Sequence, residues 1–482
     1  MHAPTLRRLA AALDPGALLT AQEDVRPYEC DALTGHRALP EAVALPASTD
    51  QVAALVRTCH ADGVPFVARG AGTGLSGGAL PVAGGVVISL ARMTRVLDVD
   101  VINARVVVQP GVANAAVTAA VAEHGLYYAP DPSSQAVCSI GGNVAENSGG
   151  AHCLKHGFTV HHVVGAVMVC ADGRVARLGG AVWDTPGYDL LGAVVGSEGT
   201  LGIVTEVTLR VLRRPQAVRM LLAAFSSIEA AAEAVSAIVA AGVLPAAVEM
   251  MDRLTREASE QAVHAGYPDC EALLLVEVDG PTDECLAQLD ACRAICVDNG
   301  AAEVRVAVDE AERALMWKGR RAAFAAMGRV SPAYYVQDGV VPRTRLPEVL
   351  RGIGELAREY GMRVGNVFHA GDGNLHPLVC YDASVAGEAP RALELAGRIL
   401  DLCIAAGGSI TGEHGVGVDK ACSMPKMFDG AALTVMDRVR AAFDPNRLCN
   451  PGKLLPTPRL CGEVPGFHRV HPLEAAGLAE RW

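Results

Sequence analysis

The sequence predicts an α+β protein with more than one domain, and three observations support that prediction. Its 482 residues exceed the length at which a single hydrophobic core usually stops growing. Hydrophobic residues make up 51% of the chain and charged residues 20%, a balance that favours extensive burial over disorder. Two different patterns also follow one another, glycine-separated strands first and alternating strands and helices afterwards.

The first pattern consists of short β-branched runs separated by glycine turns within residues 64–212. The runs read PFVAR, GVVISL, RVVVQPG, VVGAVMV and TLGIVTEVTLRVL. Asp172 and Gly173 predict a hairpin turn between two of these strands. A helix is expected over Val112–His124, because Gly125 supplies the left-handed residue that commonly ends a helix.

The second pattern combines four strands with two helices. The strands read RMLLAAF, AAVEMM, ALLLVEV and EVRVAV, and the helices are expected over Ser227–Ala240 and Thr282–Val297. This order is typical of the split βαβ, or ferredoxin-like, fold. Three further helices are expected, near Glu310–Met327, Leu346–Tyr360 and Arg391–Ala405.

Charge and hydropathy disfavour two classes of function. The net charge is −12 and the basic residues are scattered, so no stripe of Lys and Arg could follow a nucleic-acid backbone. No apolar stretch reaches the roughly 18 to 20 residues that span a bilayer, and the N-terminus with Arg7 and Arg8 predicts an amphipathic helix instead of a signal peptide. The fourteen cysteines contain no C-x-x-C pair, which predicts reduced thiols, no iron–sulfur ligand set and a cytoplasmic location.

A glycine loop, Gly72–Gly77, fits the G-x-G-x-x-G pattern of dinucleotide-binding proteins, and Asp98 stands where a ribose-binding acid would be expected. That pattern requires a helix directly after the loop, whereas Pro81 and a strand follow here. Glycine clusters also make ordinary tight turns. Two more glycine-rich segments, residues 130–150 and 196–209, favour a large nucleotide cofactor bound by backbone N–H groups.

A metal site is predicted around two histidines. His369 and His376 flank Asp372-Gly373, where a turn could bring both imidazoles together, and Glu413 adds a carboxylate. This donor set suits zinc, manganese or iron and leaves positions open for substrate. The spacing alone is weakly specific, because two histidines can equally serve as hydrogen-bonding groups in a polar turn.

Several motifs resemble a known superfamily. The segments RGAGTGLSGGA, PDPSSQAVCSIGGNVAENSGG and GSEGTLGIVTEVTL are similar to the FAD-binding domain of the vanillyl-alcohol oxidase and p-cresol methylhydroxylase superfamily. HAGDGNLH, GEHG and FDPNRLCNPGKLLP resemble its flavin-dependent 2-hydroxy-acid dehydrogenases, and YECDALTGHRALP and YYVQDGVVPR resemble the family of bacterial glycolate oxidase D subunits.

The resemblance implies a domain plan. A two-part FAD-binding domain would cover residues 1–215, and a ferredoxin-like substrate (cap) domain with the metal site would cover residues 216–445, including a helical C-terminal region. Residues 446–482 would return to the flavin.

The resemblance also implies which residues hold FAD: Gly70, Gly72, Thr73, Gly74, Leu75, Ser76, Pro130, Ser139, Gly141, Gly142, Asn143, Glu198, Ile203, Val204 and Asn450. Some members of the superfamily attach flavin covalently through a histidine. The diphosphate loop of this chain contains none, so noncovalent FAD is expected.

By the same resemblance, His369, His376 and Glu413 are ligands of a divalent metal, with zinc the first candidate, and His414 is the general base. A bound cation lowers the pKa of an alcohol enough for a histidine to take its proton. Arg320, Arg343 and Asn374 are the candidates for binding substrate, although Arg320 could equally be a surface arginine on a helix.

The implied reaction is oxidation of glycolate to glyoxylate, with D-lactate or another D-2-hydroxy acid as the alternative substrate. Two alternatives from other classes are a zinc hydrolase and a non-catalytic flavin scaffold for electron transfer. The resemblance further implies a second flavin subunit and an iron–sulfur subunit as partners, through which the chain would sit peripherally at the inner face of the membrane.

Overall fold

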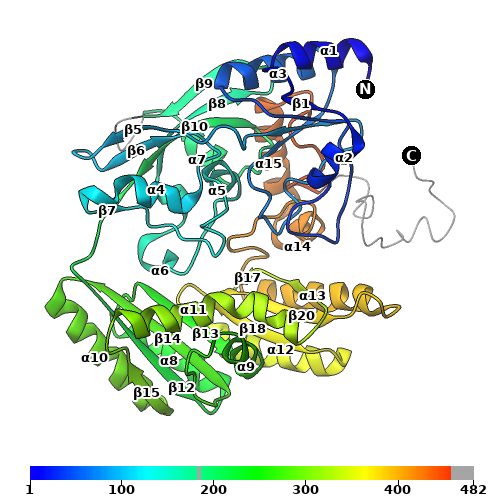
Figure 1. Cartoon of the computed structure of the whole chain (residues 1–482). Helices are drawn as coiled ribbons and strands as arrows, with labels where there is room; N and C mark the ends of the chain where they lie inside the picture. The colour runs from blue at the N-terminus through cyan, green and yellow to red at the C-terminus, as the bar shows by residue number, and fades with distance from the viewer. Residues whose placement is uncertain (181, 183–185, 457–482) are drawn as a thin grey trace. The chain divides into compact units, whose positions relative to one another are not determined.

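The computed structural model describes residues 1–180, 182 and 186–456, and they form two compact units (Figure 1). Of the described residues, unit 1 comprises those within 1–148, 158–213 and 414–456. Unit 2 comprises residues 149–157 and 214–413. Residues 414–445 therefore group with unit 1 by contacts, and residues 457–482 of the predicted C-terminal segment lie outside the described residues.

Unit 1 contains two main sheets. The first has the order β1-β2-β4-β3, with β1 Leu18–Leu19, β2 Ala42–Ala44, β4 Val86–Ser89 and β3 Phe66–Arg69, and β2, β4 and β3 run parallel. The second is antiparallel with the order β5-β6-β10-β8-β9, with β5 Val96–Asp100, β6 Arg105–Val108, β10 Gly202–Arg210, β8 Val163–Cys170 and β9 Val175–Gly179.

Three local features predicted for unit 1, a helix end, a hairpin turn and an N-terminal helix, are present in the structure. Helix α4, Asn114–Val121, continues as a 3₁₀ turn to His124 and ends at Gly125, whose φ is 68°. The Asp172-Gly173 turn joins β8 to β9, with Gly173 at φ 80°. Helix α1, Ala3–Ala11, confirms the predicted N-terminal helix.

The glycine loop of unit 1 is followed by β4 and not by a helix. A short helix begins in the second glycine-rich segment instead: α5, Ile140–Glu146, starts at Ser139, whose Oγ accepts a hydrogen bond from the N–H of Gly142 at 3.3 Å. The dinucleotide-binding topology that the G-x-G-x-x-G pattern first suggests is therefore absent from this loop, as its Pro81 and following strand predict.

Unit 2 is built on a nine-stranded sheet whose main path is β15-β12-β14-β13-β18-β19-β17. Its first half runs β12 Ala217–Phe225, α8 Ile228–Ala240, β13 Ala247–Asp252, α9 Arg253–Val263, β14 Ala272–Gly280, α10 Thr282–Asp298 and β15 Ala301–Val306. The strand order and the antiparallel pairing of all neighbours match the predicted ferredoxin-like fold. Helix α9 was not predicted, because its sequence RLTREASEQAV is mostly polar, yet Asp252 caps its first turn.

The rest of unit 2 carries the three predicted helices and the strands of the candidate site. The helices are α11 Glu310–Ala326, α12 Leu346–Tyr360 and α13 Glu388–Ala405, and the strands are β16 Ala333–Val336, β17 Gly339–Val340, β18 Val364–His369, β19 Asn374–Leu375 and β20 Pro377–Tyr381. Helices α9 and α11 pack on one face of the sheet, against a core that includes Leu222, Met251 and Leu273. No helix within the described ranges is long and apolar enough to cross a membrane.

Candidate functional site

Two histidines of unit 2 meet at a hairpin. His369 ends β18 and pairs with Asn374 of β19, and His376 lies between β19 and β20. Gly373 makes the turn at φ 81°, where a Cβ would lie 2.1 Å from the carbonyl oxygen of Val341. The two imidazole rings stand perpendicular, with their centroids 5.1 Å apart. The turn at Asp372-Gly373 thus brings the two imidazoles together, as its sequence predicted.

Glu413 joins the two histidines and completes a set that we call the His–His–Glu cluster. Its Oε1 lies 3.3 Å from Nε2 of His369 and 3.1 Å from Nε2 of His376. The three ligand atoms lie within 4.8 Å of one another. Two imidazole nitrogens and one carboxylate oxygen facing a common point fit the first coordination shell of a divalent transition metal.

Electrostatics within the His–His–Glu cluster favour an ionised carboxylate. Burial opposes ionisation of Glu413, but the two neighbouring imidazoles lower its pKa well below its usual value. Burial likewise opposes a charge on His369, while Glu249 and Glu413 raise its pKa well above that of free histidine. The cluster therefore holds charges that stabilise one another in a buried setting.

Asp338 fixes the loop that carries Glu413. This fully buried carboxylate accepts hydrogen bonds from Thr411 Oγ1 at 2.6 Å and from the N–H groups of Gly412 at 2.9 Å and Glu413 at 3.1 Å. It also accepts one from Asn374 Nδ2 at 2.7 Å. Asn374 was predicted to bind substrate, and here its amide links the hairpin to the Glu413 loop. Asp338 was not predicted as a site residue, although it lies in the YYVQDGVVPR motif.

Glu249 orients His369 from the neighbouring strand. The register places Glu249 of β13 opposite His369 of β18, and Glu249 Oε1 lies 2.7 Å from Nδ1 of His369. Carboxylates that bind the second ring nitrogen of a histidine direct the first toward its metal. Burial opposes ionisation of Glu249, but Arg320 and His369 lower its pKa. Glu249 was also missed, and its only signal was a charge inside the apolar strand AAVEMM.

Arg320 is buried and forms an ion pair with Glu249. Its Nη2 lies 2.5 Å from Glu249 Oε2, and only 3% of the residue is exposed. Helical spacing explains the placement, because Arg313, Trp317 and Arg320 lie on one face of α11. The first two of them bind Glu277 of β14, at 2.7 Å and 2.6 Å. The surface-arginine alternative for Arg320 is therefore wrong.

The other predicted substrate arginine touches the hairpin. Arg343 is half-buried, and its Nη1 donates to the carbonyl oxygen of Gly371 at 3.2 Å. Gly371 lies between the two histidines in the chain, so Arg343 stands beside the turn of the His–His–Glu cluster.

The predicted flavin residues all lie in unit 1. They are Gly70, Gly72, Thr73, Gly74, Leu75 and Ser76 in the loop between β3 and β4, Pro130, Ser139, Gly141, Gly142 and Asn143 before and within α5, Glu198 in the turn before β10, Ile203 and Val204 at the start of β10, and Asn450. Two of these segments approach closely, because a Cβ at Gly70 would lie 2.2 Å from Ser139 Oγ. Asn450 Nδ2 donates to the carbonyl oxygens of Gly78 at 2.8 Å and Glu198 at 2.7 Å, which brings three segments together.

Residues 414–417, which we call the His414 turn, belong to the same unit. His414 follows Glu413 directly, and the N–H groups of Val416 and Gly417 each donate to the Glu198 carboxylate at 2.7 Å. Glu198 thus links two segments: its side chain accepts from the backbone after His414, and its carbonyl oxygen accepts from the side-chain amide of Asn450.

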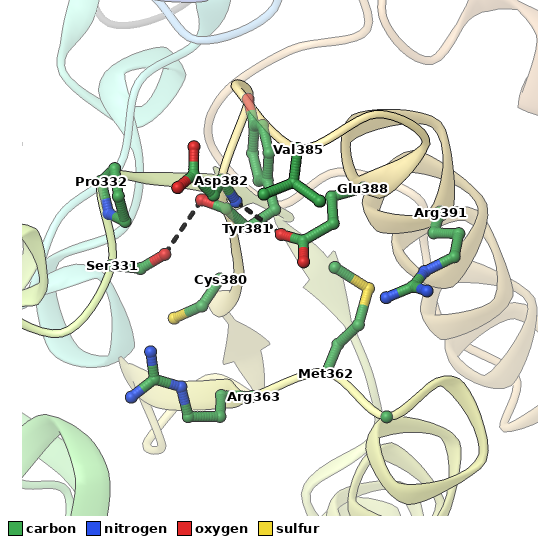
Figure 2. Close-up of a pocket in the computed structure, with 11 residues that line it drawn as sticks. Ser331, Pro332, Met362, Arg363, Cys380, Tyr381, Asp382, Val385, Glu388 and Arg391 are labelled. Atoms are coloured by element: carbon green, nitrogen blue, oxygen red, sulfur yellow. Dashed lines mark hydrogen bonds between the residues drawn. The ribbon is translucent and has the colours of Figure 1, made fainter.

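A separate hollow of about 360 Å³ lies in unit 2 (Figure 2). It is lined by Ser331, Pro332, Gly361, Met362, Arg363, Cys380, Tyr381, Asp382, Val385, Glu388 and Arg391. Ser331 donates to the Tyr381 carbonyl oxygen, and Glu388 accepts from the Asp382 N–H. No predicted site residue lines this hollow, so the candidate site is the one around His369.

Two family models match this chain, one in its N-terminal part and one in its C-terminal part. The family model of the FAD binding domain matches residues 40–179, and that of the FAD linked oxidases, C-terminal domain, matches residues 214–454. The chain is 50% identical to the glycolate oxidase subunit GlcD of Escherichia coli (strain K12), over 94% of this chain and 91% of that protein. It is 39% identical to GlcD of Bacillus subtilis (strain 168), over 89% and 91%. A D-lactate dehydrogenase of Anaerostipes hadrus is 33% identical, over 87% and 90%.

Solved structures confirm the predicted fold class. The structure of p-cresol methylhydroxylase with substrate bound superposes with a TM-score of 0.80 at 17% identity, covering 93% of this chain and 96% of that one. The 4-ethylphenol oxidase from Gulosibacter chungangensis gives a TM-score of 0.78 at 18% identity, covering 94% and 97%.

The Arg320–Glu249 pair leads to a stability prediction. Arg320→Met leaves the Glu249 carboxylate buried without its cation, so we expect the free energy of unfolding to fall by about 3 to 5 kcal/mol. The double variant Arg320→Met/Glu249→Gln removes both charges and should lose less. Urea denaturation of the purified FAD-loaded protein measures both losses.

Arg321→Met is the matched control, because this exposed neighbour only stacks over Trp317, at 5.2 Å from the ring centre. It should cost about 0.5 to 1 kcal/mol. Equal losses for the Arg320 and Arg321 variants would show that the ion pair with Glu249 contributes little.

Proposed function

This chain belongs to the family of FAD-linked oxidases, and from that premise we propose that it oxidises a small 2-hydroxy acid, glycolate, at the His–His–Glu cluster. It is an FAD-dependent oxidoreductase. The observation that carries the proposal is the convergence of two imidazoles and a carboxylate in unit 2, with His414 as the very next residue. A chain this similar to GlcD over nearly its whole length supports glycolate as the substrate.

FAD, when bound, accepts the hydride that leaves the substrate Cα. We assign its binding to the three segments of unit 1 that Asn450 and Ser139 draw together. Glycines in two of these segments let backbone N–H groups approach a diphosphate closely. The loop at residues 70–77 contains no histidine, which supports noncovalent attachment.

A divalent cation in the His–His–Glu cluster, when bound, lowers the pKa of the substrate hydroxyl. We propose zinc first, with manganese and iron as alternatives. The residues support this assignment: the Nε2 atoms of both histidines face Glu413 Oε1, and Glu249 fixes the ring of His369 from behind.

His414 is the proposed base that takes the hydroxyl proton. Arg320 would recognise the substrate carboxylate, with Arg343 beside the hairpin as the second candidate, and Asn374 would add a hydrogen bond to the substrate. A guanidinium carries five N–H donors, so Arg320 can neutralise Glu249 and still present N–H groups to a second carboxylate.

A D-2-hydroxy acid such as D-lactate is the second candidate substrate, because D-lactate dehydrogenases are 32–33% identical to this chain. One methyl group in an apolar pocket changes discrimination by only about 1 to 3 kcal/mol, so similarity at this level fits both acids.

Electron transfer beyond the flavin is proposed to involve partner subunits. The matched GlcD proteins are named as subunits of glycolate oxidase. The described cysteines form no disulfide with one another, and no candidate metal group in that part of the chain includes a cysteine. We propose a second flavin subunit and an iron–sulfur subunit, with a cytoplasmic chain held peripherally at the membrane through them.

Anaerobic mixing tests the function directly. Glycolate should bleach the flavin absorbance of the purified protein, and metal analysis of the same sample should find about one divalent ion per chain. D-Lactate and D-2-hydroxyglutarate serve as the competing substrates. A yellow protein that none of the three acids bleaches would instead be an electron-transfer scaffold, and a colourless metalloprotein would point to the hydrolase.

Replacing the proposed base should separate chemistry from cofactor binding. His414→Gln removes the proton acceptor, so flavin reduction by glycolate should slow by about 10²- to 10⁴-fold while FAD content stays unchanged. Stopped-flow absorbance measures the rate. His124→Gln changes an exposed histidine of the same unit and should reduce at the normal rate, and a normal rate in His414→Gln would exclude His414 as the base.

Removing the carboxylate behind His369 should weaken metal binding. Glu249→Gln no longer supplies an anion to Nδ1, so metal affinity should fall by about 10- to 100-fold. Competition with a fluorescent chelator measures affinity without using turnover. Glu271→Gln, at an exposed ion pair of unit 2, is the control and should bind metal normally. Unchanged affinity in Glu249→Gln would argue against metal at His369.

A further inference from the structure

Two carboxyl groups converge beside the His414 turn in unit 1, and the mechanism above uses neither as an acid. Glu146 ends α5, and Glu198 lies in the turn before β10. The backbone N–H of Glu198 donates to the carbonyl oxygen of Ala145 at 2.8 Å, so the two residues belong to directly bonded segments.

Both carboxyl groups face the backbone of Gly415. A Cβ placed on Gly415 would lie 1.9 Å from Glu146 Oε2 and 3.1 Å from Glu198 Oε1. Gly415 also has φ 87°, which favours glycine. The residue after His414 therefore has no room for a side chain, because the two carboxyl groups fill that space.

The two groups differ in their hydrogen bonds. Each oxygen of Glu198 accepts from a backbone N–H, of Val416 and of Gly417, which favours the ionised form. Glu146 Oε1 has only a long contact with Ser76 Oγ, at 3.5 Å, and its buried Oε2 has no hydrogen-bond partner within the described chain. Two carboxylates this close in a buried setting cannot both ionise cheaply.

The surrounding charges assign the proton to Glu146. Burial raises its pKa well above the usual value, and the Glu198 and Asp31 charges raise it further, against an opposing effect of Lys420. Burial raises the pKa of Glu198 as well, but its two backbone N–H groups, Lys420 and Lys453 offset part of that rise.

Building on the function proposed above, we propose that Glu146 stays protonated and forms, with ionised Glu198, an acid pair that positions the turn carrying His414. Glu198 binds the turn through two N–H groups, and Glu146 fills the space left by Gly415 and reaches the glycine loop at Ser76. The turn also packs on that loop, since the N–H of Val418 donates to the Ser76 carbonyl oxygen at 3.0 Å. Glu146 is thus a positioning residue.

The pH dependence of unfolding tests the buried proton in the FAD-loaded protein. A carboxyl group whose folded pKa is raised holds a proton that the unfolded chain releases, so its contribution to stability declines as pH rises above the unfolded glutamate value. Between pH 5 and 8, the unfolding constant of the native protein should rise relative to that of Glu146→Gln, by up to about tenfold per pH unit.

Glu123→Gln, at an exposed carboxylate of unit 1, is the control and should keep the native pH dependence. Infrared spectra supply a second readout, a protonated carboxyl band that Glu146→Gln loses and Glu123→Gln keeps. The native pH dependence and the band both persisting in Glu146→Gln would overturn the proposal.

Flavin reduction by glycolate tests positioning. Glutamine keeps the size, polarity and neutrality of the protonated acid, so Glu146→Gln should reduce within about threefold of the native rate, whereas Glu146→Leu should lose tenfold or more with FAD retained. A native rate in Glu146→Leu would reject the positioning role. Loss of the pH dependence in Glu146→Gln together with a native rate in His414→Gln would support the acid pair and reject only the proposed base.

Discussion

A buried charge is stable only beside an opposite charge or enough hydrogen-bond partners. This requirement determines which residues surround the candidate site of unit 2. Glu249, Asp338 and Glu413 are carboxylates of this site, and each is compensated differently. Glu249 has an arginine and an imidazole, Asp338 has backbone and side-chain N–H and O–H donors, and Glu413 has two imidazoles. Glu249 holds the His369 ring, Asp338 holds the loop of Glu413, and Glu413 holds both histidines. The interactions that compensate these buried charges are therefore also the ones that position the candidate metal ligands.

Local sequence signals predicted much of the fold and the core of this site. Glycines, caps and hydrophobic periodicity located α4, α8, α10, α11 and α12 within a few residues, and the Asp372-Gly373 turn predicted that His369 and His376 would meet. The resemblance implied that Glu413, distant from the two histidines in the chain, is a ligand together with them. These predictions succeeded because each feature is decided by neighbouring residues or by a recognisable motif.

The supporting carboxylates could not be predicted in the same way. Glu249 contacts His369 across 120 positions, through the register of two strands that are not consecutive in the chain. Asp338 reaches Glu413 across 75 positions through a loop. Helix α9 was missed because its sequence is mostly polar, and its place is decided by the sheet and by α11. Pairing over such distances is a property of the tertiary structure.

Neighbours, and not burial alone, decide what a buried carboxyl group does in this chain. Glu413 and Glu146 are both carboxyl groups shielded from water, yet the pKa of Glu413 is lowered and that of Glu146 is raised. Two imidazoles stand beside Glu413, whereas another carboxyl group stands beside Glu146. An anion suits a cation site, and a neutral acid suits close packing against a second carboxylate. The chain order adds the last link, because the sequence Glu413-His414-Gly415 passes from the first environment to the second within three residues. The groups that position the proposed base thus differ in kind from those that surround the proposed metal, although Glu413 and His414 are consecutive residues.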